Sequence, residues 1–219
     1  MLKLVKNPYI AFSGGKDSTV LSHLVRQLKP DIPHVFFDAK CSFPETQEFL
    51  KRMSKKINLI IYEIKEPFLE TLKRKGLLDP LIESETMKVT VYQPIREILA
   101  KYKFDGVFLG LRAHESIGRS QLLRSKSKIF FNKRDNIWQF LPLGWWKASE
   151  IWMYIDVKNL DYNRVYDVYT PLQPREELRC SYWAGETNRR RGRFVYLKYY
   201  YPSLWNELLA KRPEAGYFI

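Results

Sequence analysis

The amino-acid sequence predicts an α/β fold: a doubly wound, mostly parallel sheet of five strands with a small helical C-terminal extension. Short apolar runs alternate along the chain with longer segments in which apolar residues recur at helical spacing. This alternation is typical of stacked strand–helix–strand units, which build parallel sheets. The chain has 219 residues, of which 45% are hydrophobic and 28% are charged. These values suit a globular domain with a full core.

The first strand and the first helix meet at a glycine-rich turn. The apolar run of residues 9–12 is predicted to be a strand, and it ends at the Ser-Gly-Gly of residues 13–15. From Asp17 onward apolar residues recur at helical spacing until Pro30, which predicts a helix over that stretch.

The same alternation continues to about residue 110 and then weakens. Further strands are predicted at residues 34–37, 59–64 and 107–110, and further helices at residues 44–56, 67–75 and 94–103. Beyond them we expect a hairpin of residues 128–131 and 137–140, and helices at residues 148–157 and 203–210. The expected division is an α/β domain over residues 1–155 and a basic, tyrosine-rich extension over residues 156–219 that packs on it.

The chain is strongly basic. It has 37 Lys and Arg against 24 Asp and Glu, which gives a formal net charge of +13. An excess of this size favours polyanionic partners, either nucleic acid or highly phosphorylated small molecules. A solvated basic surface without a nucleic-acid partner is the alternative.

The cysteines and the hydropathy pattern indicate where the protein works. Cys41 and Cys180 lie far apart and form no Cys-x-x-Cys pair, which argues against a disulfide scaffold, a zinc ribbon or a redox pair of neighbouring thiols. No apolar run is long enough to span a bilayer, and the first residues lack the apolar block and cleavage site of a signal peptide. We therefore expect a cytoplasmic protein with reduced thiols and no membrane partner.

The strongest functional signal is the turn between the first strand and the first helix, Phe-Ser-Gly-Gly-Lys-Asp-Ser-Thr at residues 12–19. Its two glycines permit backbone angles closed to other residues, so successive N–H groups can point into one concavity. The following helix adds its positive dipole end. Lys16, Ser18 and Thr19 add further donors. The segment predicts an anion-binding nest at the carboxyl edge of the sheet, where open α/β sheets bind ligands.

Two better-known phosphate loops are excluded. A Walker A loop needs glycine five positions before its Gly-Lys pair, where this chain has Ile10. The dinucleotide fingerprint Gly-x-Gly-x-x-Gly is also missing. A tight Gly-Gly turn capped by Asp17 and Ser18 is the structural alternative to an anion nest.

Charged residues follow two further strands at the same edge of the predicted sheet. Arg112 and Arg119 follow the fourth strand, and guanidinium groups suit phosphate and sulfate oxygens. Glu115 would orient an arginine or a metal-bound water, although a surface ion-pair cluster on a helix is the alternative. Asp38 ends the second strand, where it would meet a ribose or an adenine, or cap the loop that follows.

The Ser-Gly-Gly-Lys-Asp-Ser loop resembles the pyrophosphate-binding (PP) loop of the Rossmann-like adenine nucleotide alpha-hydrolase superfamily. Three further segments resemble its branch of phosphoadenosine phosphosulfate (PAPS) reductases and ATP sulfurylase small subunits. They are Phe-Phe-Asp with Ser-Phe-Pro-Glu-Thr within residues 36–46, Gly-Leu-Arg-Ala-His-Glu-Ser-Ile-Gly-Arg at residues 110–119, and Pro-Leu-Gly-Trp-Trp-Lys-Ala-Ser-Glu-Ile-Trp at residues 142–152. The C-terminal end looks like that of small phage-type PAPS reductase-like proteins.

The resemblance implies that residues 1–155 bind an adenine nucleotide, either ATP or PAPS or adenylyl sulfate as substrate, with Mg²⁺. The implied nucleotide-binding residues are Ser13, Gly14, Gly15, Lys16, Asp17, Ser18, Thr19, Asp38 and Gly110. The implied catalytic residues are Lys16, Asp17, Arg112, Glu115 and Arg119. The sequence identifies no metal ligand.

The cysteines leave the reductase reaction open. Assimilatory PAPS reductases carry a C-terminal Glu-Cys-Gly-Leu-His motif, which this chain lacks. Cys180 lies in a different context, where arginines at 179 and 189–191 would lower its pKa. Cys41 follows the second strand, near the expected ligand edge. Each cysteine is either a redox thiol or a buried structural one.

The C-terminal extension combines arginines with tyrosines. An arginine-rich run at residues 188–193 precedes Tyr196 and three tyrosines at residues 199–201. Arginines hold phosphates and aromatic rings stack on bases, so the segment would grip a nucleic acid or close over the phosphates of a small nucleotide. A basic turn followed by an amphipathic helix packed through its tyrosines is the third interpretation.

The leading hypothesis is an enzyme that acts at the α-phosphate of ATP or of an adenylyl-sulfate nucleotide. The nest would hold the phosphates, while Arg112 and Arg119 hold the incoming oxyanion or the developing charge. Thiol-dependent PAPS reduction, ATP-dependent nucleic-acid modification such as base thiolation, and nucleotide binding without turnover are the alternatives. The sequence is compatible with a partner protein or a homo-oligomer.

Overall fold

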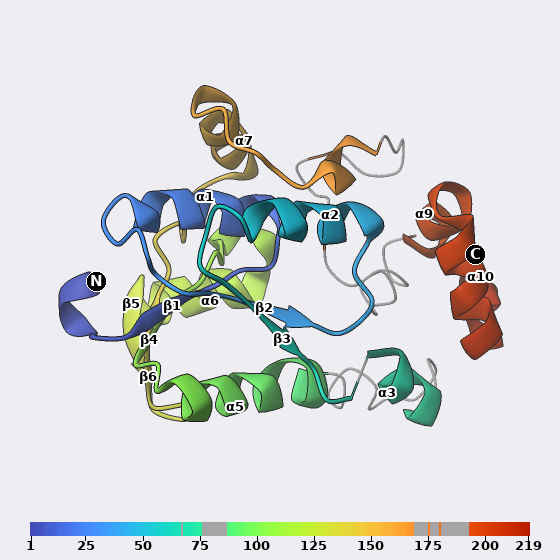
Figure 1. The fold of residues 1–219 in the computed structure, drawn as a ribbon, viewed down its shortest axis with the longest axis horizontal. Coiled ribbons are helices and arrows are strands. Elements are labelled where there is room, and N and C mark those ends of the chain that lie inside the picture. Colours follow the sequence, from blue (N-terminus) through green and yellow to red (C-terminus); the bar gives the residue numbers. More distant parts are fainter. Residues whose placement is uncertain (67, 76–86, 169–174, 176–179, 181–192) are drawn as a thin grey trace. The chain divides into compact units, whose positions relative to one another are not determined.

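A computed structural model of the protein describes residues 1–66, 68–75, 87–168, 175, 180 and 193–219 (Figure 1). The strands are β1 (Pro8–Ala11), β2 (His34–Asp38), β3 (Leu59–Glu63), β4 (Gly106–Phe108), β5 (Ile129–Asn132) and β6 (Ile137–Phe140). The α-helices of the described residues are α1 (Lys16–Arg26), α2 (Pro44–Met53), α3 (Phe68–Lys75), α5 (Gln93–Tyr102), α6 (Ile117–Lys126), α7 (Ala148–Val157), α9 (Arg193–Tyr200) and α10 (Pro202–Lys211). Short 3₁₀ turns lie at Leu2–Leu4, Ala113–Glu115, Arg164–Asp167 and Pro213–Phe218, and a π-helical turn at Lys88–Tyr92 precedes α5.

The strands form one mostly parallel sheet in the order β3-β2-β1-β4-β6-β5. β1 pairs in parallel with β2 and β4, and β4 pairs in parallel with β6. The predicted fold class is confirmed, but within the described residues the sheet has six strands rather than five. The extra strand arises because both arms of the predicted hairpin join the sheet: β6 pairs with β4, and β5 pairs antiparallel with β6 at the edge.

The chain divides into two compact units. The first comprises Met1–Phe36, Glu48–Ile61 and Arg96–Asn163, and the second comprises Phe37–Gln47, Tyr62–Ile95 and Arg164–Ile219. The first unit contains the glycine-rich loop and the residues that follow β4, so most of the candidate site lies within it. The expected boundary between a nucleotide-binding domain and an extension near residue 155 stays a prediction.

Aromatic and aliphatic side chains fix the start of the glycine-rich loop in the first unit. α1 covers one face of the sheet and α5 covers the other, and α7 packs on α1 (Figure 1). Phe12, the residue directly before the loop, is buried in a cluster with Phe36, Phe49 and Leu50. The loop therefore begins at an anchored position between a central strand and the first helix.

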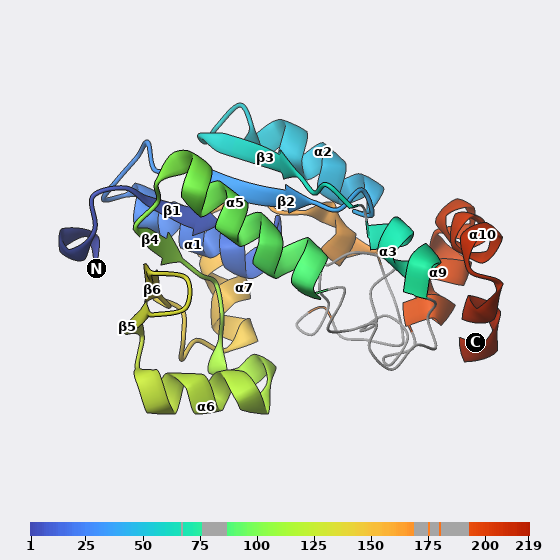
Figure 2. The ribbon, with the colours of Figure 1, turned by 90° about the horizontal axis from the view of Figure 1, so that it is seen from below.

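α6 lies beside the β5–β6 hairpin (Figure 2) and was not predicted from the sequence. Leu123 of this helix is buried in a cluster with Ala113 and Leu141. At its start, the hydroxyl of Ser116 accepts a hydrogen bond from the Arg119 N–H at 3.3 Å, which caps the helix. The cap fixes Arg119 in the first turn of α6.

Two tyrosines of the second unit, Tyr196 and Tyr201, pack against each other with ring centroids 5.7 Å apart, whereas Tyr199 is 72% exposed. Tyr196 and Tyr201 are buried, and their ring centroids lie 6.4 and 5.0 Å from that of Phe43. The hydroxyl of Tyr201 donates a hydrogen bond to Oε1 of Glu45 at 2.9 Å. This arrangement fits the interpretation of an amphipathic helix packed through its tyrosines. Within the described part of the chain, no helix is both long and apolar enough to cross a bilayer.

Candidate nucleotide site

The backbone of the loop between β1 and α1 has the geometry of a helix N-terminus, an arrangement that suits an anion. Gly14 has φ of 70°, in the left-handed region that favours glycine. Gly15 caps α1, and its carbonyl oxygen accepts the first helical hydrogen bond from Thr19 N–H at 3.0 Å. The N–H groups at the start of α1 come before this first bond, so the helix itself offers them no acceptor. Such amides, together with the helix dipole, form an anion site.

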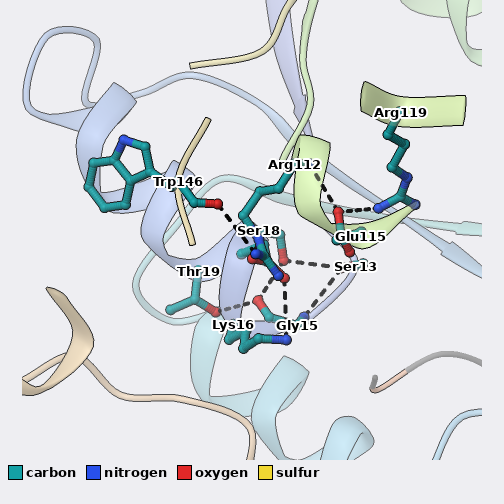
Figure 3. A network of polar contacts seen from close by, with 10 residues as sticks. Ser13, Gly15, Lys16, Ser18, Thr19, Arg112, Glu115, Arg119 and Trp146 are labelled. Atoms are coloured by element: carbon teal, nitrogen blue, oxygen red, sulfur yellow. Dashed lines mark hydrogen bonds and ion pairs between the residues drawn. The ribbon is translucent and has the colours of Figure 1, made fainter. Parts of the chain in front are cut away.

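Three hydroxyl groups hold the loop in shape (Figure 3). Those of Ser18 and Thr19 both donate to the carbonyl oxygen of Gly15, at 2.9 and 3.0 Å. The hydroxyl of Ser13 accepts from the Gly15 N–H at 3.3 Å and donates to Oγ of Ser18 at 3.2 Å. These residues come together as the sequence suggested, and their direct contact with phosphate stays a prediction.

Two buried cations share one carboxylate at the start of α1. Nε of Arg112 donates to Oδ1 of Asp17 at 2.5 Å, and Nζ of Lys16 lies 3.6 Å from Oδ2 of the same residue. Arg112 is only 3% exposed, and its Nη1 also donates to the backbone oxygen of Trp146 at 3.4 Å (Figure 3). Lys16 and Arg112 thus bring positive charge to the start of the loop. This charge is complementary to a phosphate group.

Glu115 lies between the two arginines that follow β4. Its Oε2 accepts hydrogen bonds from the backbone N–H of Arg112 at 3.0 Å and from Nη1 of Arg119 (Figure 3). Burial by itself raises the pKa of Glu115, but the Arg119 charge and the two hydrogen bonds outweigh it and hold the pKa below its ordinary value. The carboxylate is therefore ionised at neutral pH. It orients the Arg119 side chain, which is 30% exposed.

Gly110 follows β4 and packs closely against the backbone at the start of α1. A Cβ atom at this position would lie 3.3 Å from both the carbonyl carbon of Asp17 and the nitrogen of Ser18. A larger residue would therefore press on the backbone of the first turn. The glycine allows the close approach that brings Asp17 within reach of Arg112.

Asp38 is the last residue of β2 and belongs to the second unit. Its Oδ1 accepts from the Lys40 N–H at 2.8 Å, and its Oδ2 lies 3.2 Å from Lys40 Nζ. Lys40 has φ of 57°, and Asp38 therefore caps a tight turn after the strand. This capping was one of two roles expected for Asp38. Contact with a ribose or an adenine stays a prediction.

The two cysteines are buried and form no disulfide. Burial, with the nearby charges of Asp38 and Glu207, raises the pKa of the Cys41 thiol well above its ordinary value. The Cys41 thiol is thus kept protonated, whereas the thiolate is the reactive form. For Cys180, the arginines expected to lower its pKa, at 179 and 189–191, lie outside the described residues.

Two contacts at the loop were missed by the sequence analysis. The side-chain amide of Asn163 is fully buried and donates to the carbonyl oxygen of Gly14 at 3.2 Å. The backbone oxygen of Trp146 binds Arg112. A single asparagine in a loop and a backbone carbonyl leave no pattern in a sequence. Among the residues described, no three His, Cys, Asp or Glu side chains are grouped as metal ligands.

A family model described as "Phosphoadenosine phosphosulfate reductase domain" matches residues 7–172. The chain belongs to this family. The resemblance inferred from the motifs is therefore confirmed, as is the family's nucleotide-binding fold.

Proteins similar to this chain in sequence include some that are named as reductases and one that is about twice as long as the matched region. The chain is 28% identical over 190 residues to the phosphoadenosine 5′-phosphosulfate reductase of Xylella fastidiosa (78% of this chain, 77% of the relative). It is 29% identical over 198 residues to the adenosine 5′-phosphosulfate reductase of Halalkalibacterium halodurans (83% and 82%). It is also 29% identical over 210 residues to the uncharacterised protein MJ0973 of Methanocaldococcus jannaschii, covering 94% of this chain but 48% of that protein. The chain thus spans about half the length of this relative.

Solved structures share the fold at low sequence identity. The PAPS reductase of Candida auris, in a phosphate complex, has a TM-score of 0.60 at 21% identity and covers 79% of this chain and 83% of its own. The FMN adenylyltransferase of Candida glabrata with FMN and an ATP analogue has a TM-score of 0.54 at 18% identity (73% and 51%). The U34-tRNA thiolase NcsA of Methanococcus maripaludis has a TM-score of 0.53 at 16% identity (80% and 65%).

Proposed function

We propose that the protein binds an adenine nucleotide through residues 13–19 and catalyses a reaction at the α-phosphate of ATP or of an adenylyl-sulfate nucleotide. The observation that carries this proposal is the buried cation pair at the start of α1. Lys16 and Arg112 share the single carboxylate of Asp17, beside a loop whose backbone suits an anion. Phosphate groups suit both this charge and the amides at the start of α1.

We assign different roles to the charged residues according to how deeply each is buried. Arg112 is buried and held at two points, so it fixes Asp17 and the first turn of α1 rather than moving with a substrate. Arg119 is partly exposed and oriented by Glu115, so it is the residue we assign to an incoming oxyanion or to the developing charge. Lys16 and the loop amides would hold the remaining phosphates.

The proposed reaction depends mainly on positioning and electrostatics. An incoming oxyanion attacks the α-phosphorus, and the leaving group is pyrophosphate from ATP or sulfate from an adenylyl-sulfate nucleotide, so the attacking group needs no base to remove a proton. Mg²⁺, when bound with the nucleotide, would neutralise phosphate charge, and phosphate oxygens and water would supply most of its ligands. Asp17 is the acidic side chain of the loop, and it already pairs with Lys16 and Arg112.

Thiol-dependent reduction of PAPS or adenylyl sulfate is the second candidate. It is supported by relatives that are named as reductases and that cover most of the chain. The raised pKa of Cys41 disfavours that thiol, so Cys180 is the nucleophile we assign to this reaction. The Cys180 thiolate would attack the sulfur and displace the nucleotide, leaving a cysteine S-sulfonate. An external dithiol would then release sulfite, return Cys180 to the thiol and be oxidised to a disulfide, so it supplies the two electrons of the reaction.

Modification of a nucleic acid is the third candidate, and the net charge of +13 supports it. The arginine run that would contact a nucleic acid falls largely at residues 188–192, outside the described residues. A partner protein or a second copy of the chain is compatible with this candidate.

The deciding experiment separates these reactions by their products. The purified protein is incubated with Mg²⁺ and α-labelled ATP, or with sulfur-labelled PAPS or adenylyl sulfate, in separate reactions with sulfate, a dithiol or tRNA. Thin-layer chromatography then identifies the products. We expect AMP or an adenylylated product from ATP, abolished in Arg119→Ala and retained in Arg124→Ala, which removes an exposed arginine from the same helix. Sulfite release that needs the dithiol and Cys180 would establish reduction instead, and nucleotide binding without any product would contradict both.

A further inference from the structure

Asn163 is a fully buried polar residue at the end of the first unit. Its Nδ2 donates to the carbonyl oxygen of Gly14 at 3.2 Å, across 149 residues of sequence. A buried side-chain amide bonded to a loop carbonyl is expensive to lose, because either group would then be buried without its partner. The contact therefore joins the segment after α7 to the glycine-rich loop.

The bond determines the orientation of the peptide between Gly14 and Gly15. In a trans peptide the carbonyl oxygen and the N–H point in opposite directions. Asn163 holds the oxygen, and the hydroxyl of Ser13 accepts from the N–H at 3.3 Å. A peptide between two glycines rotates at little steric cost, so without these bonds it would have alternative orientations.

The orientation matters for an anion because a carbonyl oxygen carries partial negative charge. Asn163 is buried, so the Gly14 oxygen faces the protein interior. Rotation of the peptide would break both bonds, change φ of the cap residue Gly15 and turn the oxygen away from the interior. The loop would then present a repulsive group near the phosphates.

The segment that carries Asn163 is itself held on α2. Nε and Nη2 of Arg52 donate to the two carboxylate oxygens of Asp161 at 3.0 and 3.1 Å, and Nη2 also donates to the backbone oxygen of Tyr162 at 3.3 Å. The Tyr162 ring lies edge-on to that of Trp152, with centroids 5.4 Å apart. Such a bidentate pair gives geometric specificity. The contacts fix the chain directly before Asn163.

We propose that Asn163 is a positioning residue for phosphate binding: it locks the Gly14–Gly15 peptide in the orientation that leaves the anion side of the loop to N–H groups. This inference rests on the proposed function only in that the loop binds phosphate. It does not depend on which reaction follows.

The test compares isosteric variants of two asparagines. Asn163→Asp keeps the shape of the side chain but removes the donor to Gly14, and Asn163→Ala removes the side chain. Asn7→Asp is the matched control, because Nδ2 of Asn7 donates to the backbone oxygen of Tyr102 at 2.8 Å, at the other end of β1. Calorimetry measures the dissociation constants of inorganic pyrophosphate and ATP, and the ¹⁵N–¹H spectrum reports the Gly15 amide without ligand.

We expect Asn163→Ala to weaken pyrophosphate and ATP binding about three- to tenfold, the equivalent of one hydrogen bond. Asn163→Asp should weaken it by about tenfold or more, because it adds a negative charge. Both should shift the Gly15 amide resonance, whereas Asn7→Asp should lower the melting temperature with unchanged affinity and an unchanged Gly15 resonance. Wild-type affinity and an unshifted Gly15 amide in a folded Asn163 variant would overturn the inference alone. A wild-type protein that binds neither pyrophosphate nor any adenine nucleotide would overturn the inference together with the proposed function, whereas binding without turnover would leave the inference standing.

Discussion

Arg112 and Asp17 form a direct ion pair, Nε to Oδ1 at 2.5 Å, although 95 residues separate them in the sequence. The pair joins the segment after β4 to the first turn of α1, at the two places where the sequence predicted phosphate chemistry. It is largely shielded from water, so salt should weaken it little. The pair thus contributes to the fold and to the candidate site together.

Removing one partner of this pair should cost more than removing both. Arg112→Met leaves Lys16 as the cation beside Asp17 among the described residues and should lower the free energy of unfolding by about 3–5 kcal/mol. The double change Arg112→Met with Asp17→Asn should recover part of that loss, because no unpaired carboxylate remains. Urea unfolding of the two single variants and the double variant measures this coupling. Additive effects of the two changes would show that the pair does not act as a unit.

The sequence predicted the part of the site that depends on local patterns. The Gly-Gly turn at residues 14–15 follows an apolar run and precedes a helical period, so its place could be inferred without tertiary contacts. α6 escaped detection because Leu123 is its fully buried apolar residue, whereas Ile117 is 79% exposed, so its apolar period is weak. Asn163 gives no periodic signal at all, because its role arises only from a contact with Gly14.

Gly110 should be sensitive to a single added methyl group. In Gly110→Ala the new Cβ would press on the backbone of Asp17 and Ser18 at 3.3 Å, which should cost about 1–3 kcal/mol of stability and weaken ATP binding. Gly118→Ala is the control, because a Cβ added there would meet nothing within 4 Å and alanine favours the helix. Urea unfolding and ATP titration compare the two. Equal free energies of unfolding and equal ATP affinities in the two variants would mean that the first turn of α1 adjusts to the added methyl group without a measurable cost.

The free energy of unfolding should fall in mild acid because His34 is buried in its neutral form. Its Nε2 lies 2.8 Å from Oγ of Ser22, and burial lowers its pKa from 6.5 to about 4. The folded state therefore binds the proton less readily than the unfolded chain, so this contribution is intact above pH 6.5 and declines as the pH falls towards 4. At pH 5 the loss should be about 2 kcal/mol. Urea unfolding at pH 7 and pH 5 should reveal a smaller loss for His34→Gln, and an identical loss in both proteins would exclude His34 as its source.

The thiol of Cys41 should be unreactive in the folded protein. Its pKa is raised, first by burial and then by the charges of Asp38 and Glu207, so little thiolate is present at neutral pH. In Cys180→Ser, which leaves Cys41 as the single thiol of the chain, modification by a disulfide reagent at pH 8 should be about 100-fold slower than in urea, because it needs local opening. Cys41→Ser should also retain turnover of the nucleotide substrate. Rapid labelling of the folded protein, together with loss of PAPS reduction in Cys41→Ser, would instead make Cys41 the redox residue, because only an accessible thiolate can attack sulfur.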